Sequence, residues 1–248
     1  MINAIKTVNI MTSKYCNLDC LYCTWKHTQH LSEYVKIEEE INNDKDNFFF
    51  FIGTNEPFLN LNYLEDIITL AINKKNVVDK IGVYTNGTID NEQVFNLLHK
   101  YRNNIELIVS LDGTQEYHDL YRVDHSGNGT YNKVINFINK YNFIVNEIAV
   151  TTCPSYDIVK CLKHILEVCV KNDIFNILVT PVISNKFFSK FKWSKRRLIE
   201  YYQILDQFEQ YINCVSPNLK LIRSCSYCFD EIIIINKNNK IKRSNIFE

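Results

Sequence analysis

Short apolar runs recur along the chain, and a longer stretch with apolar residues at helical spacing follows each of them. The runs cover residues 4–11, 48–53, 80–85, 105–111, 147–152 and 176–182. Several are nearly continuous in Ile, Val or Phe, which is typical of strands that are buried on both faces of a parallel sheet. The pattern therefore predicts six strands of this kind.

The stretches between the runs predict amphipathic helices. They cover residues 61–72, 90–101, 131–141, 158–170 and 195–211. Strand and helix alternate, which predicts βαβ units in a right-handed parallel array. A doubly wound sheet and a barrel both satisfy this pattern, and in both the working site lies at the carboxyl ends of the strands.

The tail has a different pattern. Residues 229–236 and 240–244 are separated by a Lys-Asn-Asn turn, which predicts a β-hairpin that forms a small C-terminal cap.

Composition narrows the class of protein. Lys plus Arg number 28, as do Asp plus Glu, and this balance argues against general nucleic-acid binding, which needs a basic surface. No apolar run is long enough for a membrane span, and the N-terminus lacks the pattern of a secretory signal. The 9 cysteines are therefore expected to be reduced thiols or metal ligands in a cytoplasmic protein.

Three of these cysteines lie close together after the first run. Cys16, Cys20 and Cys23 have C-x3-C-x2-C spacing. Cysteine thiolates bind iron–sulfur clusters and structural zinc. Zinc would need a fourth local ligand, for which His27 and His30 are candidates. Three thiols without a fourth leave one iron of a cluster open, as a catalytic cluster requires.

This loop, with Tyr22 before its last cysteine, resembles the signature of the radical S-adenosylmethionine (radical SAM) superfamily. The resemblance implies a [4Fe-4S] cluster on Cys16, Cys20 and Cys23 whose open iron binds S-adenosylmethionine. One electron, from a donor such as flavodoxin or ferredoxin, would cleave this cofactor to a 5′-deoxyadenosyl radical that takes hydrogen from a substrate. The protein would supply placement and exclusion of water.

Other strand ends carry motifs that resemble those of the same superfamily. Glu56-Pro57 resembles the end of a Gly-Gly-Glu-Pro motif that holds the methionine amino group, and Thr54 and Asn55 occupy its glycine positions. The residues that the resemblance assigns to the cofactor are Tyr22, Thr54, Asn55, Glu56, Thr85, Asn86, Ser110, Asp112, Arg122 and Val182. Within this set, Arg122 would pair with the cofactor carboxylate, and the backbone near Val182 would hold adenine.

The string from Ser110 to Arg122 resembles the branch with a C-terminal SPASM or twitch extension, whose members often modify peptides or proteins. Glu116, His118 and Asp119 in this string are interpreted as capping or surface residues. Cys214, Cys225 and Cys228 resemble the start of such an extension and are candidate auxiliary metal ligands, although the later pattern is reduced. Cys153 is a candidate hydrogen-atom donor, or else a small buried core residue.

The sequence thus predicts a partial (β/α)6 TIM-like barrel over residues 1–212 and a degenerate SPASM/twitch-like cap over residues 213–248. The expected function is radical modification of a peptide or protein side chain, as in maturation of ribosomal peptides. The alternatives are a glycyl-radical-enzyme activase, a small-molecule radical SAM enzyme and, in another class, a non-catalytic zinc-binding protein.

Overall fold

The computed structural model describes residues 5–23, 31–43, 47–74, 78–182, 191–223 and 232–234. The strands are β1 (Ile5–Ile10), β2 (Asn47–Ile52), β3 (Val78–Thr85), β4 (Glu106–Ser110), β5 (Val145–Thr152), β6 (Asn176–Pro181), β7 (Lys220–Arg223) and β8 (Ile232–Ile234). The helices are α1 (Tyr34–Asn43), α2 (Leu61–Asn73), α3 (Glu92–Tyr101), α4 (Gln115–Tyr121), α5 (Tyr131–Lys140), α6 (Ile158–Lys171) and α7 (Lys195–Val215), with one 3-10 turn, η1 (Pro57–Leu59).

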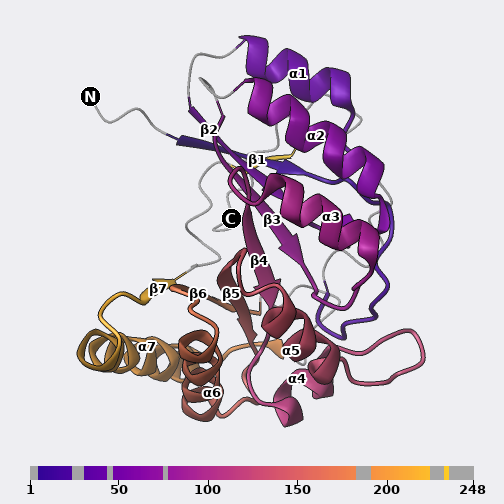
Figure 1. Cartoon of the computed structure of the whole chain (residues 1–248). Helices are drawn as coiled ribbons and strands as arrows, with labels where there is room; N and C mark the ends of the chain where they lie inside the picture. Colours follow the sequence, from indigo (N-terminus) through magenta and orange to yellow (C-terminus); the bar gives the residue numbers. More distant parts are fainter. Residues whose placement is uncertain are drawn as a thin grey trace.

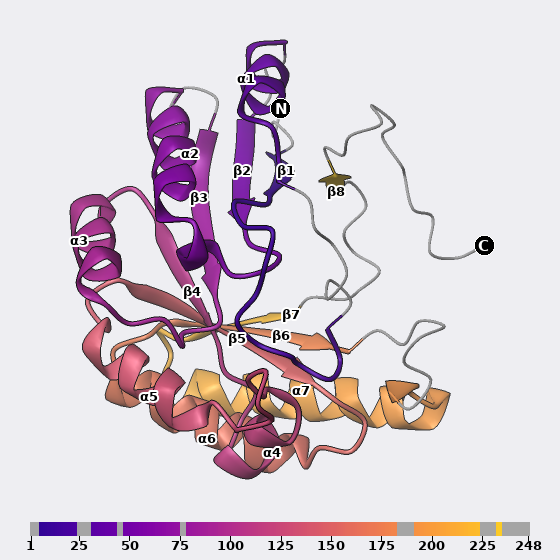
Figure 2. The same ribbon diagram turned by 90° about the vertical axis from the view of Figure 1, so that its right-hand side faces the viewer.

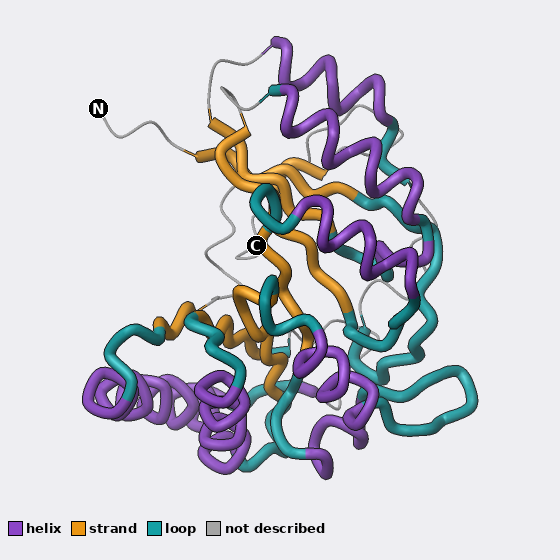
Figure 3. Tube along the Cα trace, in the orientation of Figure 1, coloured by secondary structure: helices purple, strands orange, loops and turns teal. Residues whose placement is uncertain are grey.

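All strands join one sheet in the order β7-β6-β5-β4-β3-β2-β1-β8, and every pairing is parallel. The sheet curls, and the helices lie along its outer side (Figures 1 and 2). The tube view separates an outer band of helices from the strands (Figure 3). This arrangement confirms the partial barrel, and the six predicted strands begin and end within about two residues of the observed ones.

The expectation that the strands are buried on both faces holds only in part. In β4, the successive residues 107–109 are all buried, whereas other strands alternate. Phe48 and Phe50 are fully covered, whereas Phe49 and Phe51 between them are only half-buried. The strand β5 alternates in the same way. Successive side chains of a strand point to opposite faces, so the helix-facing side is core while the concave side retains accessible surface.

Four elements were not foreseen from the sequence pattern: α1, η1, α4 and β7. The strand β7 pairs with β6, and β8, which lies in the first arm of the predicted hairpin, pairs parallel with β1. The second arm, 240–244, lies outside the described residues. The helix α7 continues across the predicted boundary at residue 212, and the division into barrel and cap stays a prediction. Among the described helices, none combines the length and the apolar character that a bilayer crossing needs.

A strained turn follows β2. Thr54 has φ 61° and Asn55 has φ 67°, so both adopt the left-handed conformation that favours glycine. These are the two positions where the resembled motif has glycines. Asn tolerates this conformation better than a β-branched residue does. Asn55 also gains a hydrogen bond, because its Nδ2 donates to the Ser13 carbonyl over 3.1 Å.

Replacing Thr54 with glycine is expected to stabilise the fold. Relief of the left-handed strain, less the added backbone entropy of glycine, should raise the free energy of unfolding by about 0.5–1 kcal/mol. Asn55→Gly is the matched control and should gain less or lose stability, because it removes the bond to Ser13. Urea denaturation measures both. A larger gain from Asn55→Gly than from Thr54→Gly would contradict this account of the turn.

Candidate functional site

The cysteine loop follows β1 and is fastened to the last residue of α4 and to the segment after it. The Asp19 N–H donates to the Val123 carbonyl over 2.8 Å, and the Leu21 N–H donates to the Tyr121 carbonyl over 2.9 Å. Leu18 forms an antiparallel bridge with the residue after Val123. Because the loop itself has little regular structure, these backbone bonds determine where its thiols lie.

The three cysteines of this loop are free and half-buried. Burial raises the pKa of Cys20 to about 12 and also raises that of Cys16, while the nearby Arg122 partly opposes the shift at Cys20. The Cys16 Sγ accepts hydrogen bonds from the Leu18 N–H at 3.4 Å and from Asn86 Nδ2 at 3.7 Å. Thiols held protonated in this way lose their protons when a metal binds.

The chemistry of this donor set fits an iron–sulfur cluster, because the three thiols come from one loop at the carboxyl edge of the sheet, lie near enough to affect one another's pKa and retain accessible surface. In this structure the thiols are not grouped tightly enough to hold a single metal ion, and the same is true of every other set of three His, Cys, Asp or Glu side chains among the described residues. His27 and His30, the candidate zinc ligands, lie outside those residues.

Glu56 links the ends of β2 and β3 and has no exposed surface. Its carboxylate accepts hydrogen bonds from Thr85 Oγ1 at 2.9 Å, from the Asn86 N–H at 2.8 Å and from the Phe58 N–H at 3.2 Å. Asn86 in turn donates to Asn17 in the cysteine loop over 2.8 Å. The carboxylate therefore positions the turn that supports the loop. Burial raises the pKa of Glu56 to about 7, and these three donors limit the rise.

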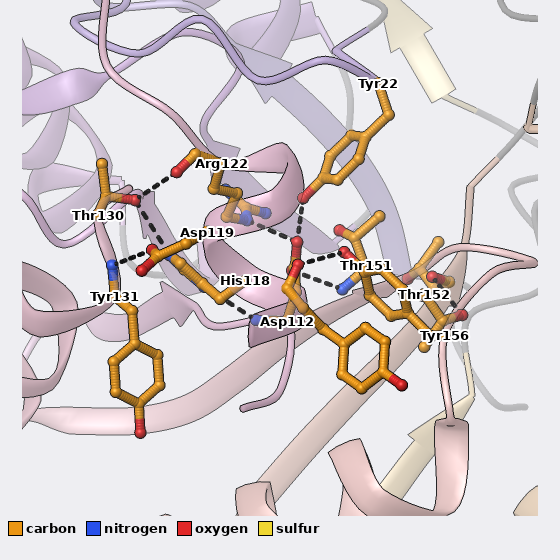
Figure 4. A network of polar contacts seen from close by, with 12 residues as sticks. Tyr22, Asp112, His118, Asp119, Arg122, Thr130, Tyr131, Thr151, Thr152 and Tyr156 are labelled. Atoms are coloured by element: carbon orange, nitrogen blue, oxygen red, sulfur yellow. Dashed lines mark hydrogen bonds and ion pairs between the residues drawn. The ribbon is translucent and has the colours of Figure 1, made fainter. Parts of the chain in front are cut away.

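Asp112, at the end of β4, is the centre of a second buried network (Figure 4). Its Oδ2 accepts from Arg122 Nε at 2.9 Å and from the Tyr22 hydroxyl, and its Oδ1 accepts from the Thr151 N–H at 3.0 Å. The Arg122 guanidinium also lies 5.6 Å from the centre of the Tyr22 ring. Burial raises the pKa of Tyr22, so its hydroxyl keeps the proton that it donates. The network joins the cysteine loop, β4, β5 and the end of α4.

The predicted cofactor residues fall into two groups. Thr54, Asn55 and Ser110 are half-buried and retain accessible surface at the strand ends. The rest are buried, namely Tyr22, Glu56, Thr85, Asn86, Asp112, Arg122 and Val182. Buried side chains of this kind serve a ligand by holding the accessible ones in place.

Val182 follows β6, and its backbone groups are already used within the chain. The Val182 N–H donates to the Thr152 carbonyl over 2.8 Å, and its carbonyl accepts from Trp193 Nε1 at 3.0 Å. These bonds join β5, β6 and the segment before α7. Its predicted role toward adenine stays a prediction.

Cys153 lies after β5 and has no exposed surface. Burial raises the pKa of its thiol, so the sulfur stays protonated. Cys153 is part of the hydrophobic core, as the interpretation as a small buried residue expects. Its role as a hydrogen-atom donor stays a prediction. Cys214 is exposed on α7, whereas Cys225 and Cys228 lie outside the described residues, so the auxiliary metal site stays a prediction.

The interpretation of His118 as a capping or surface residue is wrong. His118 has no exposed surface and bonds to the Asp112 network, whereas Glu116 is exposed and pairs with Lys160 at 2.9 Å. A signal was present in the sequence, because His118 precedes Arg122 by four residues and so shares its helical face. Thr151 was also missed, since it contributes a backbone group that no side-chain pattern reveals.

The buried Glu56 carboxyl predicts a pH dependence of stability. Its pKa is raised from 4.5 to about 7 in the folded chain, so the folded state holds this proton more tightly than the unfolded state does. Its contribution is complete below the unfolded pKa, and ~3 kcal/mol is lost as pH rises through the folded pKa.

Glu56→Gln, which resembles the protonated acid, should remove this dependence of the free energy of unfolding on pH. Unfolding of the cluster-free protein by urea across this pH range measures the difference from the unsubstituted chain. Burial also raises the pKa of Glu147 to about 7. Because Glu147 is present in both proteins, its contribution to the pH dependence cancels in the difference between them. Parallel stability profiles for the two proteins would contradict the assignment.

The amino-acid sequence resembles those of known proteins. The family model described as the Radical SAM superfamily matches residues 10–152, which is more than half of the chain. A cysteine-type anaerobic sulfatase-maturating enzyme of Clostridium novyi (strain NT) is 28% identical over 156 residues, which cover 56% of this chain and 41% of that protein.

Two solved structures share the fold. The enzyme anSMEcpe with bound AdoMet superposes with a TM-score of 0.69 at 20% identity, over 88% of this chain and 64% of that one. SuiB of Streptococcus suis bound to S-adenosylmethionine gives a TM-score of 0.69 at 15% identity, over 91% of this chain and 51% of that one. The chain therefore spans less than two thirds of the length of each of these relatives. From the extent of the family match, the chain belongs to the radical SAM superfamily, whose cofactors are a [4Fe-4S] cluster and S-adenosylmethionine.

Proposed function

We propose that the chain cleaves S-adenosylmethionine reductively and uses the resulting radical to modify a peptide or protein side chain. The observation that carries this proposal is the fastening of the cysteine loop to the strand ends through Asp112, Arg122 and Tyr22. In a superfamily member, three thiols held against a polar, partly accessible strand edge are suited to a cluster and its co-substrate.

The proposal assigns the cluster to Cys16, Cys20 and Cys23. When bound, the cluster and S-adenosylmethionine supply a 5′-deoxyadenosyl radical that removes a hydrogen atom from the substrate. The chain's own contribution is placement. Thr54, Asn55 and Ser110 retain the accessible surface needed to contact the co-substrate.

Glu56 and Asp112 act behind these residues. A carboxylate accepts about four hydrogen bonds, and Glu56 already accepts three from within the chain. We assign the methionine amino group to polar groups of the turn at Thr54 and Asn55, and we assign Glu56 to holding that turn against β3. Arg122 keeps Asp112 paired and lies close enough to Cys20 to favour its thiolate form.

The peptide substrate rests on the relatives. One is named a sulfatase-maturating enzyme, one solved structure of anSMEcpe holds the Cp18Cys peptide, and one of SuiB holds the precursor peptide SuiA. A separate electron donor such as flavodoxin or ferredoxin completes the proposal. A cytoplasmic location is proposed because the cluster needs reduced thiols.

Formation of 5′-deoxyadenosine tests the chemistry. The protein, reconstituted with iron and sulfide without oxygen and given S-adenosylmethionine and dithionite, should yield 5′-deoxyadenosine by chromatography. A Cys16→Ala, Cys20→Ala, Cys23→Ala variant is the control and should yield none, because it lacks the thiolates that bind iron. Zinc in place of iron, or equal product from the variant, would refute the proposal.

Transfer of deuterium tests the substrate class. Cysteine- and serine-containing peptides, deuterated at the β-carbon, should pass deuterium into 5′-deoxyadenosine and change in mass. Unlabelled peptides are the control. If no peptide reacts while a free nucleotide, sugar or amino acid does, the substrate assignment is wrong and the small-molecule alternative replaces it. Appearance of a radical only on a glycine of an added partner enzyme would support the activase alternative.

A further inference from the structure

Behind the Asp112–Arg122 ion pair lies a second layer of buried hydrogen bonds (Figure 4). His118 Nδ1 lies 3.3 Å from the backbone nitrogen of Asp112, and His118 Nε2 lies 3.0 Å from Thr130 Oγ1. The Thr130 hydroxyl lies 2.9 Å from the carbonyl of Arg122. His118 and Thr130 have no exposed surface, so no solvent competes for these bonds.

We call this chain of hydrogen bonds, from the Asp112 N–H through His118 and Thr130 to the Arg122 carbonyl, the relay. Each of its protons can lie on only one atom. The Asp112 N–H can only donate, so His118 Nδ1 accepts. Nε2 then carries the ring proton and donates to Thr130, whose own hydroxyl proton goes to the Arg122 carbonyl. Burial lowers the pKa of His118 to about 4, which agrees with a neutral ring. The hydrogen bonds therefore run from the Asp112 N–H to His118, from His118 to Thr130, and from Thr130 to the Arg122 carbonyl, which accepts the last one.

Thr130 is available for this role because another residue caps the helix α5. Thr130 occupies the position before α5 where a hydroxyl normally caps the helix, yet it forms no such bond. Asp119 supplies the cap instead, since its Oδ1 accepts from the Tyr131 N–H at 2.8 Å. A Cβ on Gly129 would come within 2.2 Å of the Asp119 carboxyl carbon, so the glycine makes room for this substitute cap.

The relay closes a ring with the ion pair. One side of the ring joins Asp112 Oδ2 to Arg122 Nε over 2.9 Å, and the other joins the backbones of the same two residues through His118 and Thr130. The carbonyls that flank Arg122, from Tyr121 and Val123, hold the cysteine loop. A shift of the Arg122 backbone would therefore move both the ion pair and the cluster loop.

We infer that His118 and Thr130 are positioning residues of the S-adenosylmethionine site, acting through the backbones of Asp112 and Arg122. The inference deepens the proposed function and rests on it. Hydrogen bonds one layer behind a metal site typically contribute 10–100-fold to affinity or activity, and we expect the lower end of this range here.

Thr130→Val tests this role because it deletes the hydroxyl and keeps the shape of the side chain. Thr114→Val is the matched control. Thr114 also starts a helix next to the site, and its buried hydroxyl has no hydrogen-bond partner among the described residues. Thr130→Ser restores the hydroxyl and should rescue the loss.

In the reconstituted holoenzyme, Thr130→Val should weaken binding of S-adenosylmethionine about tenfold. Thr114→Val and Thr130→Ser should stay within about twofold of the unsubstituted chain. Equilibrium dialysis gives the dissociation constants, and thermal unfolding of each variant shows whether it folds. Equal affinity of Thr130→Val and Thr114→Val would overturn the inference and leave the proposed function intact. Failure of the unsubstituted holoenzyme to bind S-adenosylmethionine would overturn both.

The tautomer of His118 gives a readout that does not depend on any variant. Nitrogen-15 NMR of histidine-labelled protein at neutral pH should show a neutral His118 ring with its proton on Nε2. Thr130→Val should perturb this signal, while Thr114→Val should leave it in place. A proton on Nδ1, or a charged ring, would overturn the relay whatever the binding constants are.

Discussion

The burial of the Asp112 carboxylate is the constraint on which the site depends. An ionised carboxylate removed from water costs several kcal/mol unless charge and hydrogen bonds compensate it. Arg122, Tyr22 and the Thr151 N–H provide that compensation, and they come from α4, the cysteine loop and β5. The charge therefore favours only those arrangements in which all these elements have assembled. Removing Arg122 alone would leave an unpaired buried charge, a change that typically costs about 3–5 kcal/mol.

The Glu56 carboxylate is also buried, but the donors that stabilise it are neutral. Neutral donors from Thr85, Asn86 and Phe58 surround its carboxylate, and burial still raises its pKa to about 7. Its hydrogen bonds hold the ends of β2 and β3 against each other, and through Asn86 they reach the cysteine loop. The loop is thus supported on two sides, by Glu56 near β2 and β3 and by Asp112 near β4 and β5. The parallel sheet makes this possible, since it brings all these carboxyl ends to one edge.

The turn at Thr54 and Asn55 shows how such support tolerates local strain. Two consecutive non-glycine residues in left-handed conformation cost about 1–2 kcal/mol each. The bond from Asn55 to the Ser13 carbonyl and the bond from the Glu56 N–H to the Tyr15 carbonyl hold the turn against the cysteine loop. The conformation persists because neighbouring elements over-determine it, and it keeps the backbone shape that glycines provide in the resembled motif.

The sequence by itself determined the alternation of strands and helices, the family and the cysteine loop. These features are local: apolar periodicity identified 48–53 as a strand, and the spacing of Cys16, Cys20 and Cys23 needed only eight residues of chain. Only the tertiary structure decided that Tyr22 reaches Asp112 across 90 positions in the sequence and that β7 extends the sheet. It also decided that side chains on the concave face of the sheet, such as Phe49 and Phe51, are only half-buried. His118 shows most clearly where inference from the sequence ends. Its spacing to Arg122 places both on one helical face, but that face turns inward because Asp112 and Thr130 bond to the ring, and folding alone brings those partners together.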